Sequence, residues 1–295
     1  MDDCIGRTPI PRRMGSGLFA ALQRQEDAVP VNQYERAFRA WPLLTVRASQ
    51  GSKVSYAELA EHLGIHPRPI RYVLGVIQDW CLRERKPPLT ILVVSQHGGQ
   101  PGQGFIAWDA SHLDAGYGEV FSYPWLTLSN PFQFAAQDST PEELARAVVT
   151  RPQDAAEVYQ KVRSRGITQV IFRLALLEVY RQRCAFCGLS LKDALQAAHI
   201  IPWGIANAEQ RVSPVNGLLL CSTHHALFDA GILSISADRR IVCHHAKVPG
   251  HQWTDTDQHI AGALDGQSMR LPADRRLWPS DAALAYHSTG SAHSA

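Results

Sequence analysis

Four metal-binding side chains, arranged as two pairs, constrain the fold of this 295-residue chain more than any other feature of its sequence. Cys184 and Cys187 form a Cys-x-x-Cys turn, and Cys221 with His224, three residues on, forms a second pair of the same reach. A Cys3His set is typical of tetrahedral zinc. We therefore predict a structural Zn²⁺ that closes a folded loop, which is where a metal clip stabilises a chain most.

The other cysteines leave part of this assignment open. Cys243, followed by His244 and His245, is a competing source of the fourth ligand, and spacing alone does not exclude it. Cys4 and Cys81 are adequately explained as small buried side chains. Six cysteines spread this unevenly do not make a disulfide scaffold in a chain of this length, which indicates a reducing compartment.

Composition sets the class of protein. With 45% apolar and 19% charged residues, the chain can bury a sizeable core in one or two domains. No apolar run approaches the roughly 18 residues that a membrane span needs, and the first thirty residues lack the apolar stretch of a secretion signal. We therefore expect a cytoplasmic protein without a membrane partner.

Charge is informative only locally. The net charge of +2 does not by itself indicate a nucleic-acid partner. A cluster of basic residues just before Cys184, which includes Arg173 and Arg181, would suit the phosphate groups of DNA. A solvated helix face explains the same cluster equally well.

The first structured block reads as two helices followed by a hairpin. One helix begins after Ser55 and ends at Gly64, and a second begins near Pro69. The apolar positions of the second keep helical spacing, at Ile70, Val73, Leu74, Ile77 and Cys81. Leu89–Val94 and Phe105–Trp108, separated by a glycine-rich turn, predict a hairpin.

Over residues 34–109 this layout resembles the winged-helix DNA-binding modules. The resemblance implies that the second helix enters the major groove and that the hairpin follows the DNA backbone. The side chains then presented to DNA would be His66, Arg68, Arg71 and Tyr72. A helix-turn-helix also serves as a structural or protein-binding unit, which is the alternative here.

An aromatic segment follows at residues 117–134, with Tyr123, Trp125, Phe132 and Phe134. Such a segment lines either a pocket for an unstacked or modified base or the hydrophobic core. After it, Pro141 begins a helix, and residues 155–183 keep the helical spacing that delivers the chain to Cys184.

The loop enclosed by the zinc ligands carries polar residues that a zinc site does not need. His199 ends an extended apolar stretch, and Asn216 lies at a turn where its amide can tie the loop to backbone groups. His225 and Asp229 lie one helical turn apart and can share a cation. The sequence therefore predicts a base, a brace and a cation site close together.

At these residues the chain resembles the HNH endonucleases of the ββα-metal superfamily, in their zinc-stapled form. The resemblance covers residues 167–236 and includes Phe-Arg-x-x-Leu-Leu before the first cysteine and Phe-Asp-Ala-Gly-Ile after the last histidine. It implies catalytic roles for His199, Asn216 and His225. His199 would take a proton from the attacking water, Asn216 would hold its loop, and a Mg²⁺ or Mn²⁺ ion at His225 would neutralise charge on the phosphate.

One position departs from the family pattern. Many members carry an acidic residue or histidine immediately before the catalytic histidine as a cation ligand, whereas this chain has Ala198. We infer that Asp229 takes over, because a carboxylate four residues after His225 points the same way and suits a hard cation. If the change instead abolished cation binding, the module would be an inactive DNA-binding relic.

These assignments predict an α+β protein with five segments. A mobile arm (1–32) precedes a winged-helix-like DNA-reading domain (33–135), a helical linker (136–166), a ββα-metal nuclease domain (167–279) and a disordered tail (280–295). Double-stranded DNA is the expected partner.

Two functions from different classes follow. The first is a restriction-like DNA endonuclease, specific for modified (methylated) DNA read by the N-terminal domain. Since one HNH site cuts one strand, cutting of both strands would need two events or a homodimer. The second is a zinc-stapled DNA-binding or regulatory protein without catalysis.

Overall fold

The computed structural model describes residues 31–96, 99–102, 105–162 and 164–290. In its first part, apolar residues at helical spacing form helices that pack on one another. The described residues from Gln33 onwards form one compact unit. The predicted arm, apart from its last two residues, lies outside the described residues, as does Cys4. The first helices and strands are α2 (Gln33–Ser49), β1 (Val54–Ser55), α3 (Tyr56–Leu63), α4 (Ile70–Arg83), β2 (Val93–Val94) and α5 (Leu113–Ser122).

The two predicted helices of the first block are confirmed. The Ser55 hydroxyl accepts a hydrogen bond from the Glu58 amide at the start of α3, and Gly64 ends this helix with φ of 67°, a left-handed conformation that favours glycine. All five apolar positions predicted for α4 are buried. The helices pack against α2, whose Ala37, Ala40 and Leu44 are fully buried.

The predicted hairpin is not formed. Leu89–Leu92 is a buried 3-10 turn, and β2 pairs in parallel with β1 rather than with residues 105–108, which contain no strand. A single antiparallel bridge joins Val94 to Pro101. Ile106 is 79% exposed, whereas Phe105 and Trp108 pack against the core, so the expected second strand contributes side chains to the core without pairing as a strand. A winged-helix layout is therefore not shown.

The aromatic segment belongs to the core. Trp125 and Phe132 are fully buried and meet Trp41 edge to face, each with ring centroids 5.9 Å apart. Trp80 completes this cluster against Trp41 at 5.0 Å. Aromatic pairs in this geometry stabilise beyond the burial of their area. The core interpretation thus accounts for the aromatics of 117–134 that the alternative placed in a base pocket.

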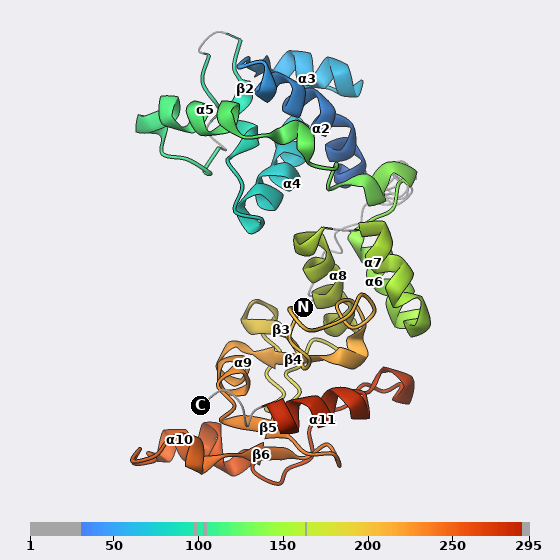
Figure 1. The fold of residues 1–295 in the computed structure, drawn as a ribbon, viewed down its shortest axis with the longest axis vertical. Helices are drawn as coiled ribbons and strands as arrows, with labels where there is room; N and C mark the ends of the chain where they lie inside the picture. Colours follow the sequence, from blue (N-terminus) through green and yellow to red (C-terminus); the bar gives the residue numbers. More distant parts are fainter. Residues whose placement is uncertain (1–30, 97–98, 103–104, 163, 291–295) are drawn as a thin grey trace, which may run out of the picture. The chain divides into compact units, whose positions relative to one another are not determined.

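Three helices connect the first block to the C-terminal block: α6 (Pro141–Thr150), α7 (Ala155–Val162) and α8 (Arg165–Val179). A capping box between Thr140 and Glu143 starts α6. Where one helix was predicted over 155–183, the structure has two: α7 ends at Val162, and α8 begins at Arg165. Figure 1 shows α6 and α7 beside α8, and both pack against it.

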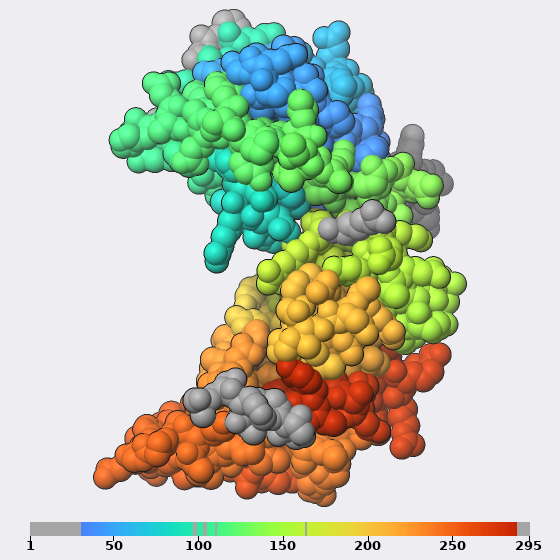
Figure 2. Space-filling model, in the orientation of Figure 1, coloured from blue at the N-terminus to red at the C-terminus, as the bar shows by residue number. Residues whose placement is uncertain are grey.

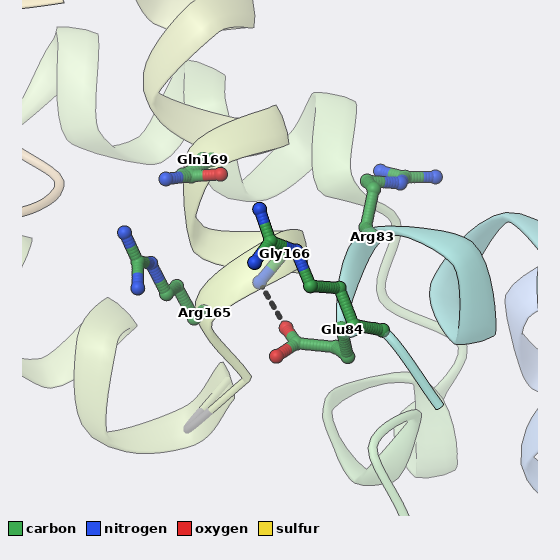
Figure 3. A pocket seen from close by; sticks show the side chains of 6 residues that line it. Arg83, Glu84, Arg165, Gly166 and Gln169 are labelled. Carbon is green, nitrogen blue, oxygen red and sulfur yellow. Dashed lines mark hydrogen bonds between the residues drawn. The ribbon is translucent and has the colours of Figure 1, made fainter. Parts of the chain in front are cut away.

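Helix α8 belongs to two hydrophobic cores. Its Ile167 and Ile171 join the core of the first block, and its Phe172 and Leu176 join the core of the C-terminal block. The N-terminal end of α8 is fixed to the end of α4, because the Glu84 carboxylate accepts a hydrogen bond of 2.6 Å from the Gly166 amide (Figure 3). Contacts with the first block and with the C-terminal block therefore both hold α8 in place.

The C-terminal block is built on two small antiparallel sheets. Strands β3 (Leu195–His199) and β4 (Gly217–Cys221) pair so that His199 lies opposite Gly217, and α9 (Ser222–Asp229) packs against both. This ββα unit agrees with the predicted α+β class. The remaining elements are β5 (Leu233–Ile235), β6 (Ile241–Cys243), α10 (Asp255–Ile260) and α11 (Asp281–Gly290).

The part of the predicted disordered tail that the structure describes is largely helical, and residues 291–295 lie outside the described residues. Residues 281–290 form α11, and its Ala283 and Leu284 are buried in the C-terminal core. Figure 2 shows the red atoms of this helix against the orange atoms of the segment that carries β5 and β6, and α11 packs on β5. Two adjacent buried side chains are too short a signal for sequence patterning.

Within the described residues, no helix is both long and apolar enough to cross a membrane.

Candidate active site and metal centre

The four predicted zinc ligands come together in one cluster. Cys184 and Cys187 lie in the turn after α8, Cys221 ends β4, and His224 lies in the first turn of α9. Their ligand atoms all lie within 4.8 Å of one another. Three of the residues are buried and Cys187 is exposed. Sulfur and imidazole donors in this arrangement can hold a metal ion such as zinc.

Hydrogen bonds orient the cluster for metal binding. The Nε2 atom of His224 lies 3.0 Å from the Ile260 carbonyl, which can only accept, so Nε2 carries the proton. The lone pair of Nδ1 then faces the Cys221 and Cys184 sulfurs, at 3.1 and 3.6 Å. Burial raises the pKa of the Cys184 thiol, but the contact with His224, when Nδ1 also carries a proton, and hydrogen bonds from backbone groups outweigh it and lower that pKa to about 6. Cys184 thus favours the thiolate, the form that binds metal, whereas burial raises the pKa of Cys187 to about 12 and that of Cys221 above its usual value.

The competing source of a fourth ligand lies elsewhere. Among the described residues, Cys243 is not part of the cluster, and its backbone amide donates to the Asp265 carboxylate. His244 hydrogen-bonds Ser234 at 2.6 Å, and the ring of His245 contacts Trp253 with centroids 4.4 Å apart. The geometry therefore favours His224 over this trio.

His199 is held in a fixed orientation at the end of β3. Its ring stacks on Phe172 with centroids 3.8 Å apart and an interplanar angle of 13°, and Trp203 meets it edge to face. Its Nε2 lies 3.2 Å from the Arg211 carbonyl. Because a carbonyl only accepts, Nε2 carries the proton and Nδ1 keeps a lone pair. Burial, followed by the charge of His225, lowers the pKa of His199 below its usual value, which favours the neutral imidazole.

Asn216 ties together the loop that follows His199. It is buried, and its amide oxygen accepts from the Ile201 amide at 2.8 Å. Its amide nitrogen donates to the Ile201 and Gln210 carbonyls at 3.1 and 3.0 Å. With three hydrogen bonds to two backbone segments, the side chain fixes the course of the loop that carries the Arg211 carbonyl.

His225 and Asp229 point at the same place. The Nε2 atom of His225 lies 3.4 Å from an Asp229 carboxylate oxygen, and its Nδ1 lies 2.6 Å from the amide oxygen of Gln196 on β3. If Nδ1 donates to Gln196, a neutral His225 turns its Nε2 lone pair towards a carboxylate. Two electron-rich atoms at this distance are compatible only with a cation near them, either a proton or a metal ion.

One segment of the C-terminal block matches a known family. Residues 184–236 match the family model described as HNH endonuclease. This segment is an HNH endonuclease domain. The resemblance predicted from the sequence is thereby confirmed, and the HNH domain indicates a nuclease that acts on DNA. A search of curated proteins finds no match to the chain.

The residues predicted to contact DNA lie in two places. His66, Arg68, Arg71 and Tyr72 are all exposed at the start of α4. There the Arg71 guanidinium donates to the Tyr72 hydroxyl at 2.7 Å and lies over its ring. Arg173 and Arg181 lie apart from this group. Arg173 donates to the Leu195 and Lys192 carbonyls, so part of its function is to hold β3, whereas Arg181 is exposed beyond the end of α8.

Two residues beside the HNH site were missed from the sequence. Gln196 shares a face of β3 with Ala198, and period-two alternation could have shown that it faces α9. Arg211 accepts from His199 through its carbonyl, while its guanidinium donates to the Tyr159 hydroxyl of α7 at 2.7 Å. Nothing in the local sequence marks Arg211, because its partner lies 52 residues away.

Proposed function

We propose that this chain is a metal-dependent DNA endonuclease in which His199 is the general base. The observation that carries the proposal is the hydrogen bond between His199 Nε2 and the Arg211 carbonyl, because it leaves Nδ1 as the proton acceptor. The lowered pKa of His199 keeps this acceptor neutral. Neutral imidazole is the form that a general base requires.

In the reaction, His199 would accept a proton from the water that attacks phosphorus, while stacking on Phe172 keeps its ring from turning. Asn216 would hold the loop that supplies the Arg211 carbonyl. His225 and Asp229 would hold a Mg²⁺ or Mn²⁺ ion, and their nitrogen and oxygen donors fit such a cation. When bound, the cation would neutralise charge on the phosphate and on the departing 3′ oxygen.

Replacement of His199 by alanine tests this assignment. We expect cutting of plasmid DNA with manganese or magnesium to fall by at least about 10²-fold, the usual contribution of a general base. Zinc content and DNA binding should stay at the wild-type level, because His199 belongs to neither the zinc cluster nor the exposed group on α4. A variant that cuts as fast as the wild type would contradict the role of His199.

We further propose that the enzyme is restriction-like and cuts modified DNA. The support is the exposed group at the start of α4. This group would give a separate DNA-reading surface to a small nuclease domain that has little room for sequence readout of its own. Methylated and unmethylated preparations of one plasmid should be cut at different rates. Equal rates would exclude dependence on methylation. Size determination with and without DNA tests the homodimer that double-strand cutting would suit.

The alternative is a zinc-stapled DNA-binding protein without catalysis. Ala198 favours it, because this buried alanine stands where many HNH enzymes have a cation ligand. The two functions differ in one measurement. A protein that binds DNA but shows no manganese- or magnesium-dependent cutting at any modification state, and no change on His199→Ala, would be the binding protein.

A further inference from the structure

A pocket of about 300 Å³ lies beside the HNH site, and sequence patterning did not indicate it. His199 and Asp229 both line it, so it opens on the two positions proposed for the base and for the cation. Its other polar lining comes from Lys247, after β6, and from Tyr286 and His287 on α11. Three separate segments of the chain therefore converge on the reacting groups.

Helix α11 is placed firmly enough to form a wall of this pocket. Its Ala283 and Leu284 are fully buried in the C-terminal core. One turn later, the His287 ring stacks on Phe228 of α9 with centroids 4.0 Å apart and an interplanar angle of 8°. Phe228 directly precedes Asp229, so the same contact fixes the helix end that carries the proposed cation ligand.

The chemistry of the pocket walls differs from side to side. One wall is apolar and includes Pro202 and Ile205, and the Ile205 side chain is 62% exposed to solvent. The other wall carries the positive charge of Lys247 and the polar rings of α11. A nucleotide has the same division, since its sugar offers apolar CH groups and its phosphate carries a negative charge. The cation proposed at His225 and Asp229 would face the phosphate that is cleaved, which leaves the Lys247 side of the pocket for the phosphate of the neighbouring nucleotide.

We propose that this pocket binds the nucleotide next to the cleaved bond, with its phosphodiester at Lys247 and its sugar against Ile205. This inference rests on the proposed nuclease function and adds a substrate-binding role for the segment after β6 and for α11. Lys247 supplies the charge, whereas Tyr286 and His287 shape the wall. The contact is made to the DNA backbone and is independent of base sequence.

The test measures how DNA binding depends on salt. In a His199→Ala background, which binds DNA without cutting it, Lys247→Ala should lower the slope of log K against log salt concentration by about 0.9, the loss of one phosphate contact on duplex DNA. Lys192→Ala is the matched control, because Lys192 is also an exposed lysine of the C-terminal block but does not line the pocket. Zinc content and the melting temperature show that each variant is folded.

Each outcome decides the proposal. A reduced slope for Lys247→Ala with an unchanged slope for Lys192→Ala supports it, and an unchanged slope for Lys247→Ala overturns it. Equal reductions in both variants would show a general effect of surface charge and would also overturn it. Because binding is measured without cutting, a wild-type protein that fails to cut DNA would refute the proposed nuclease function without deciding this test.

In the cutting protein, Ile205→Ala should raise KM with a smaller effect on kcat, because Ile205 would contact substrate that does not react. This substitution does not change the charge supplied by Lys247, so the salt slope should stay at the wild-type value. A loss of kcat alone, with KM unchanged, would show that the pocket does not hold the neighbouring nucleotide.

Discussion

Single hydrogen bonds decide which nitrogen of each imidazole in the HNH domain is free to act. An oxygen acceptor lies beside Nε2 of His199, Nε2 of His224 and Nδ1 of His225. The opposite nitrogen of His224 faces the Cys184 and Cys221 sulfurs, and that of His225 faces Asp229, whereas that of His199 is the acceptor in the proposed mechanism. Partners that lie 12, 36 and 29 residues away thus set the orientation of the three rings.

Gln196 is predicted to act through His225. Replacement of Gln196 by alanine removes the acceptor at Nδ1, so His225 can rotate or change tautomer. We expect the manganese concentration for half-maximal cutting to rise about 10- to 100-fold, as for other partners of metal-binding histidines. Gln196→Glu keeps an oxygen at the same place and should be affected much less. An unchanged manganese dependence in the alanine variant would contradict this role.

The pH dependence of cutting should report His199. Burial first, and then the charge of His225, lower the pKa of His199 below 6.5. A general base works when neutral, so kcat/KM at saturating manganese should be level at pH 7 and fall about tenfold per pH unit below the pKa. Trp203→Ala exposes the imidazole and should move the acidic limb to higher pH. An acidic limb that already begins above pH 6.5 in the wild type would contradict this prediction.

At the scale of elements, β3, β4 and α8 meet so closely that a glycine is needed. Gly217 lies opposite His199 on β4, and its backbone faces the Phe172 ring on which His199 stacks. A Cβ atom on Gly217 would lie 2.5 Å from Phe172 Cζ and 2.9 Å from Leu176 Cδ1. The close approach therefore places His199, the Phe172 ring and the β3/β4 pair in one contact.

Gly217→Ala should disturb this contact. The added methyl group must displace Phe172 or Leu176, at a cost of about 1–3 kcal/mol in the free energy of unfolding. Cutting should also slow, because displacement of Phe172 moves the His199 ring. Gly204→Ala is the control, since no atom lies within 4 Å of the position of its Cβ. Chemical denaturation of both variants gives the comparison, and equal stability would refute the packing argument.

At the scale of the whole described chain, two cores share one helix. Residues on opposite faces of α8 belong to the core around Trp41 and to the core around β3 and β4. Val212, in the loop braced by Asn216, is fully buried in the first of these. The HNH loop is therefore held by the first block as well as by its own domain.

Removal of zinc should affect the two cores unequally. The metal cluster joins the turn after α8 to β4 and α9, so a chelator should increase amide hydrogen exchange in β3, β4 and α9. The amides of α2 and α4 should stay protected, because their core of tryptophan and aliphatic side chains contains no metal ligand. Simultaneous loss of protection in both cores would show that they unfold as one unit.

The sequence determined those features that rest on local spacing. Helices α3 and α4 and each of the two ligand pairs of the metal cluster follow from residues within a few positions of one another, where backbone geometry fixes which side chains meet. The HNH family follows from motifs spread over residues 184–236. The catalytic assignment of His199, Asn216 and His225 stays a prediction, and so do the domain boundaries and the DNA contacts.

Tertiary structure decided what depends on distant partners. The second half of the hairpin was wrongly predicted because β2 pairs with β1, a strand about forty residues earlier, while Phe105 and Trp108 pack against the core without forming a strand. Helix α11 forms against β5 although its own sequence shows little patterning. The hydrogen-bond partners of His199, His224 and His225 could not be predicted either, because they lie 12, 36 and 29 residues away in the sequence. Local spacing encodes which side chains share a face, but only the packed chain determines which oxygen lies beside each imidazole.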